Sequence, residues 1–139
     1  ITFDVGSFGE PIFGGMFEVY FGNVNDIRSY YEQTHGYGFD FQAESEGEEA
    51  AAFAFQDRDR GIHGMVFGKR PENSVIAHEC SHVARMVLGG VGIPHTPDSD
   101  ECYSYYLGFL VEGVASAKKA IKENKKKKAP KVKKAKKKT

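Results

Sequence analysis

The sequence predicts an α+β fold, in which a small, mostly antiparallel sheet is combined with helices. Short stretches in the first half of the chain alternate aromatic or β-branched residues with small or polar ones, which is typical of strands. After residue 71, apolar residues recur at helical spacing instead. A chain of 139 residues is long enough for one domain with one modest core.

The first elements expected are a strand at Thr2–Val5 and a strand at Phe17–Phe21. A helix should follow, because Asn23 or Asn25 can accept a hydrogen bond from the free amides of its first turn. It should run to about Thr34, since Gly36 is a typical stop. Its apolar residues share one face, so we expect a helix that backs the sheet. They are Ile27, Tyr30 and Tyr31.

Three further strands are expected before the second helix. Tyr37–Gln42 and Ala50–Gln56 should be antiparallel neighbours, because only the acidic turn at residues 44–49 separates them. A polar turn then leads into a strand at Ile62–Phe67. We expect this strand or the one at Ala50–Gln56 to offer a sheet edge where an extended peptide could pair by its main chain.

The next helix should run from about Ser74 to Leu88 and contains a candidate metal site. His78, Glu79 and His82 form the pattern H-E-x-x-H within an apolar run that Gly89 and Gly90 should end. Residues four apart lie one above the other on a helix, so the two imidazoles can hold one ion between them. Glu79 then lies beside the water that such an ion carries. A metal ion would also offset the cost of burying these polar groups.

A catalytic zinc commonly takes three protein ligands, so a third should come from another segment. Eighteen residues separate His82 from Glu101, which completes the pattern H-E-x-x-H-x18-E. This pattern resembles the gluzincin zinc metallopeptidases and small H-E-x-x-H proteins encoded by bacterial viruses. The resemblance covers residues 74–112. It implies a minimal zincin-like fold, zinc bound by His78, His82 and Glu101, the last on a C-terminal helix, and Glu79 as general base.

Glu101 also has an alternative role. It follows Asp98 by three residues, the spacing of a capping box at a helix N-terminus. If Glu101 only caps the helix, His95 is the next candidate ligand, with Asp98 and Asp100 after it. Tyr105 lies one turn beyond Glu101 on the same helical face. The resemblance implies a tyrosine or histidine that donates to the oxyanion of a tetrahedral intermediate, and by its position Tyr105 is the candidate.

The C-terminal segment is strongly basic. Residues 118–139 hold 13 of the 19 basic residues and one acid, while the preceding residues carry a matching excess of acids. We therefore expect a zincin-like domain at residues 1–117 and a disordered, lysine-rich tail at residues 118–139, with Pro130 ending any helix that extends into it. Such a tail either improves solubility, folds back on the acidic body, or binds nucleic acid or another polyanion without sequence preference.

The remaining features concern compartment and activity. Cys80 and Cys102 are too few for a disulfide framework, so reduced thiols are expected. With no leader and no apolar run long enough to span a membrane, we expect a cytoplasmic protein, in the host cytoplasm or the virion if the source is viral. The predicted activity is zinc-dependent endopeptidase cleavage of peptides or proteins. The alternatives are a non-catalytic, zinc-stabilised virion or nucleic-acid-associated binding protein, and a nucleic-acid-binding protein whose H-E-x-x-H pattern is accidental.

Overall fold

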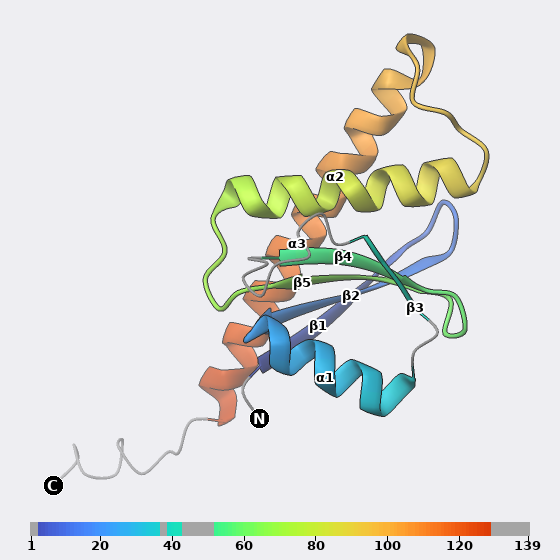
Figure 1. The fold of residues 1–139 in the computed structure, drawn as a ribbon. Helices are drawn as coiled ribbons and strands as arrows, with labels where there is room; N and C mark the ends of the chain where they lie inside the picture. The colour runs from blue at the N-terminus through green and yellow to red at the C-terminus, as the bar shows by residue number, and fades with distance from the viewer. Residues whose placement is uncertain (1–2, 37–38, 43–51, 129–139) are drawn as a thin grey trace, which may run out of the picture.

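The computed structural model describes residues 3–36, 39–42 and 52–128, which form a five-stranded mixed sheet with helices on both faces (Figure 1). The strands lie in the order β1-β2-β5-β4-β3, and all neighbours are antiparallel except β2 and β5, which are parallel. The predicted α+β class and mostly antiparallel sheet are confirmed. The strands are β1 (Phe3–Glu10), β2 (Gly15–Gly22), β3 (Phe39–Gln42), β4 (Ala52–Asp57) and β5 (Ile62–Phe67).

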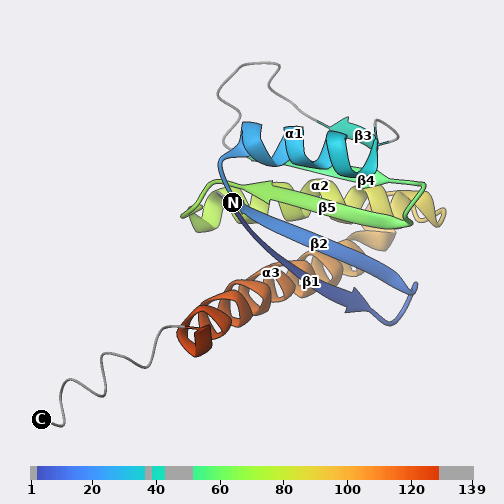
Figure 2. The same cartoon turned by 90° about the horizontal axis from the view of Figure 1, so that it is seen from below.

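The helices divide between the two faces of the sheet. Helix α1 (Val24–His35) covers one face, while α2 (Asn73–Gly90) and α3 (Asp100–Lys128) lie across the other, as the view from below shows (Figure 2). A short 3₁₀ helix, η1 (Pro97–Ser99), precedes α3. None of the described helices is long and apolar enough to cross a membrane.

Helix α1 is the predicted backing helix. The Asn23 side chain accepts a hydrogen bond from the Asp26 amide at 3.0 Å, and Gly36 ends the helix with a φ of 83°. Ile27 and Tyr31 are buried against the sheet, but Tyr30 is 42% exposed and lies off the predicted apolar face. The core on this side also contains Tyr20, Phe53, Phe55 and Val66.

The larger core lies between the sheet and the other two helices. Alternate strand residues such as Val19, Met65 and Phe67 point to this face, as the period of two requires. Helix α3 approaches β1 closely because each element has a glycine at the contact, Gly6 on β1 and Gly113 on α3. A Cβ at Gly6 would lie 3.0 Å from the Cβ of Ala117, and a Cβ at Gly113 would lie 2.4 Å from the Phe8 ring. These contacts fix α3 along the sheet.

Two strand predictions need correction. Strand β1 continues to Glu10, although Val5 was its expected end, because its whole length pairs with β2. The two strands proposed to hold a peptide at a sheet edge, β4 and β5, are interior, since each pairs on both sides. Among the described strands, β1 and β3 are the edges of the sheet. The described parts of β3 and β4 pair as predicted, while the acidic turn at residues 44–49 lies outside the described residues.

The helix boundaries also differ from those predicted. Helix α2 begins after Glu72, which makes no side-chain capping bond, and it includes Gly89 and Gly90. Helix α3 continues to Lys128, so the predicted disordered tail does not begin at Lys118. Ala117 is buried and Ile121 packs against the core, which extends the apolar stripe of the helix. Residues 129–139, including Pro130, lie outside the described residues.

Candidate metal centre

The two motif histidines meet on α2. Their Nε2 atoms are 3.1 Å apart and their ring centroids are 4.7 Å apart. Two Zn–N bonds of 2.0–2.1 Å at a tetrahedral angle require a nitrogen separation of about 3.3 Å. The separation between His78 and His82 is therefore close to that required by one shared zinc ion, and it also permits a hydrogen bond if one ring donates.

The third motif residue is a buried carboxylate beside this pair. Glu79 is 6% exposed, and its Oε1 is 3.9 Å from Nε2 of His78. His82 is also buried, at 9%, whereas the side chain of His78 is 54% exposed. The arrangement therefore opens to solvent at His78 and shields the carboxylate, as expected of a site that admits a ligand from one side.

Cys80, inside the motif, belongs to the core. Its thiol is fully buried and its Sγ lies 3.7 Å from Sδ of Met65 on β5. Burial, together with the nearby charge of Glu79, raises the pKa of the Cys80 thiol to about 12. A neutral thiol is a poor zinc ligand, so Cys80 anchors α2 to the sheet. Both cysteines are unbridged, and Cys102 is exposed.

Glu101 is not brought to the histidines. It lies at an exposed position in the first turn of α3. Helix α3 turns Tyr103, Ser104 and Leu107 toward α2, where they face Ser81, Ala84 and Arg85 across a small cavity. Among residues 3–36, 39–42 and 52–128, no group of three His, Cys, Asp or Glu side chains is arranged to hold a metal ion.

The flank of α2 that carries His82 and Glu79 differs from the flank that meets α3. Successive residues of a helix are rotated by about 100° around its axis. His82 is therefore rotated by about 100° from Ser81, and Glu79, two residues before Ser81, lies nearly opposite it on the same flank as His82. Since Ser81 and Ala84 face α3, the buried motif side chains point toward other surroundings. This geometry explains why α3 supplies no third ligand in the described arrangement.

The alternative ligands form a separate cluster. Nε2 of His95 is 3.1 Å from Oδ1 of Asp100, and its ring stacks on Tyr103 with centroids 4.3 Å apart. This pair faces the same cavity as Ser81 and does not join the motif histidines. The capping box before α3 is formed by Thr96 and Ser99, whose Oγ accepts from the Thr96 amide at 2.9 Å. The pair predicted for that role, Asp98 and Glu101, does not form it.

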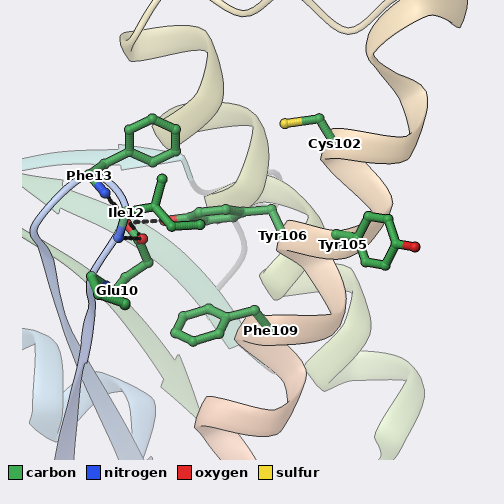
Figure 3. A pocket seen from close by; sticks show the side chains of 8 residues that line it. Glu10, Ile12, Phe13, Cys102, Tyr105, Tyr106 and Phe109 are labelled. Atoms are coloured by element: carbon green, nitrogen blue, oxygen red, sulfur yellow. Dashed lines mark hydrogen bonds between the residues drawn. The ribbon is translucent and has the colours of Figure 1, made fainter.

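Tyr105 lines an apolar pocket on the other side of α3 (Figure 3). The pocket, of about 360 Å³, lies between α3 and the turn joining β1 to β2, which contributes Ile12 and Phe13. Tyr105 is 76% exposed, and its hydroxyl points away from Glu10 (Figure 3). The structure therefore does not bring Tyr105 to the histidine pair, and its proposed oxyanion role stays a prediction.

Sequence reasoning missed this pocket. Its polar group, Glu10, is 3% exposed and accepts hydrogen bonds from the amides of Ile12 and Phe13 and from the Tyr106 hydroxyl at 3.3 Å. The apolar Pro11-Ile12-Phe13 turn was the one available signal, since turns are usually polar. Because backbone and tyrosine donors already surround the carboxylate, we assign Glu10 to holding the turn on α3.

Comparisons with protein families, with curated proteins and with solved structures find no match to this chain. The resemblance to gluzincins therefore depends on the motif residues alone, and any function must be argued from the site.

Proposed function

We propose that this protein is a zinc-dependent hydrolase of peptide bonds, with His78 and His82 as zinc ligands and Glu79 as general base. The observation that carries the proposal is the 3.1 Å separation of the two Nε2 atoms, next to a buried carboxylate on the same helix. A bound zinc ion would polarise a substrate carbonyl and lower the pKa of a water ligand to about 7. The remaining step, proton transfer, would be carried out by the Glu79 side chain.

The position of Glu79 supports the proposed role of general base. Its carboxylate is shielded from solvent but lies within 3.9 Å of the exposed His78 ring, where substrate and water can enter. In this role Glu79 accepts a proton from the attacking water and returns it to the leaving amine. Proton transfer of this kind contributes about 10²- to 10⁴-fold to a rate.

The proposal does not depend on Glu101. That residue would reach the histidines only if the first turn of α3 moved around α2, since the faces now in contact carry Ser81 and Tyr103. Glu101 as a third ligand therefore stays a prediction of the motif spacing. Glu101→Gln tests it, because the loss of a zinc ligand would weaken zinc binding, whereas the loss of an exposed surface charge would not.

A peptide substrate would be held most simply at the edge strand β3. Among the described strands β3 is an edge, and it neighbours β4, against which α2 packs. Main-chain pairing would fix an extended peptide without requiring a particular sequence. A generic unfolded protein is therefore the substrate of choice for a first assay.

The test compares cleavage of unfolded casein by the wild type, by Glu79→Gln and by the control Glu112→Gln, each loaded with one equivalent of zinc. Glu112 is an exposed carboxylate on α3, so its amide should leave the rate unchanged. We expect Glu79→Gln to keep its zinc and to lose at least about 100-fold in rate. Equal cleavage by the wild type and Glu79→Gln would refute the proposed base.

The second candidate function is a zinc-stabilised binding protein that cleaves nothing. It is favoured by the lack, among the described residues, of a third side chain placed to ligate the ion. In that case zinc would raise the melting temperature of the wild type and of Glu79→Gln equally, and neither would cleave casein.

A further inference from the structure

The last turns of α3 and the loop after β5 enclose a groove with cationic walls. The groove, of about 420 Å³, has Phe21 and Ile121 as apolar lining. Its cationic side chains come from two distant parts of the sequence, which the fold brings together. They are Lys69, Arg70, Lys118, Lys122 and Lys125.

The charge of the groove is strongly positive. Of the described residues that line it, Asp4 is the single acid, and its Oδ2 accepts a hydrogen bond from Nζ of Lys125 at 2.7 Å. Lys69 and Arg70 lie on the exposed loop between β5 and α2. A concave surface lined by charges of one sign concentrates the field and raises the local concentration of polyanions.

The lysines of α3 form a straight row. Lys118, Lys122 and Lys125 are spaced by four and three residues, so they share one flank of the helix and span about 10 Å along its axis. The neighbouring flank carries Ala117 and Ile121, which pack toward β1 and hold the row in place. A row of this length suits a chain of phosphates better than it suits one phosphate ion.

We propose that this groove binds the phosphodiester backbone of a nucleic acid duplex without reading its sequence. Lys69 and Arg70 belong to the binding surface, which therefore extends beyond the lysine-rich segment in which the sequence alone predicts polyanion binding. Among the described residues that line the groove, the single aromatic ring is that of Phe21, which is 5% exposed and so cannot stack on bases. Contacts are thus confined to phosphates, with the salt dependence that counterion release causes.

The same geometry disfavours a membrane as the partner. A helix that lies on a bilayer buries an apolar face among the lipid chains. The apolar face of α3 instead contacts the sheet through Leu110, Val114 and Ala117, all of which are buried. This leaves the cationic flank as the surface that a partner meets.

The proposal is tested with the full chain and a fluorescent 20-base-pair DNA duplex, by anisotropy titrations between 50 and 200 mM salt. We expect Lys69→Ala/Arg70→Ala to weaken binding and to reduce the slope of log K against log salt by about 2, roughly one unit for each lost phosphate contact. Both residues are exposed, so circular dichroism should show an unchanged fold.

The matched control is Arg58→Ala/Arg85→Ala, which removes the same charge at exposed positions outside the groove. This variant should bind the duplex with the wild-type slope. Equal losses in the two double variants would show that only net charge matters, and no loss in either would assign the binding to residues 129–139. Each of these results would overturn the proposal. Binding to phosphatidylserine vesicles without binding to the duplex would assign the groove to lipid and overturn it too.

Discussion

Replacing Gly64 by alanine should destabilise the face of the sheet that α1 covers. Gly64 on β5 lies opposite Phe55 on β4, and a Cβ at Gly64 would lie 2.1 Å from Cζ of that ring. Phe55 is 2% exposed and packs on Tyr31, with ring centroids 4.8 Å apart, so the ring has no solvent into which it can turn. Overpacking a core costs about 1–3 kcal/mol, and losing the ring altogether would cost about 3–5 kcal/mol.

We therefore expect Gly64→Ala to lower the free energy of unfolding by about 2–4 kcal/mol in urea titrations followed by circular dichroism. Gly108→Ala is the control, because a Cβ there meets nothing within 4 Å, and alanine in an exposed helix stabilises by about 0.5–1 kcal/mol. The cost of Gly64→Ala should shrink when Phe55 is replaced by leucine. The same cost in both backgrounds would refute the proposed clash.

Three further predictions concern polar groups that are buried or half-buried. Tyr31→Phe should lower the free energy of unfolding by about 1–3 kcal/mol, because the Tyr31 hydroxyl donates at 2.5 Å to Asp57, which is 3% exposed. An unchanged midpoint of urea unfolding would contradict this. At pH 8 a thiol reagent should modify only Cys102 in the native protein and also Cys80 in urea, since burial raises the pKa of Cys80 to about 12. Burial lowers the pKa of His63, so its contribution to stability is present above about pH 6.5 and is lost as the pH falls. The free energy of unfolding should therefore fall less between pH 7 and pH 5 in His63→Phe than in the wild type. An equal fall in both proteins would argue against this.

The elements predicted best are those whose signals are local. Asn23 and Gly36 mark the ends of α1 because a cap and a stop act within one helical turn. The far half of β1 gave no such signal. Its glycines carry no side chain that could show a period, and their use is visible only where Gly6 of β1 meets Ala117 of α3. The length of α3 depended in the same way on the packing of Ile121.

In the candidate site, too, the local features could be predicted from the sequence and those that depend on tertiary packing could not. His78 and His82 come together through helical spacing alone, so their proximity could be predicted from their positions. The place of Glu101 depends on which face α3 turns toward α2, and the packing of Tyr103 and Leu107 decides this. The apolar pattern of the sequence does not show which face of α3 contacts α2. The cationic groove was equally hidden, because it needs a loop and a helix that only the fold brings together.

The most direct test of the proposed metal centre is a zinc titration against a chromophoric chelator, with the wild type compared with His82→Ala. We expect one zinc ion per wild-type chain, and binding at least about 100-fold weaker in the variant, since half of the proposed ligand pair is gone. His95→Ala, which removes a histidine outside the pair, should bind as the wild type does. Equal zinc affinity in the wild type and His82→Ala would contradict the proposed centre and the hydrolytic activity built on it.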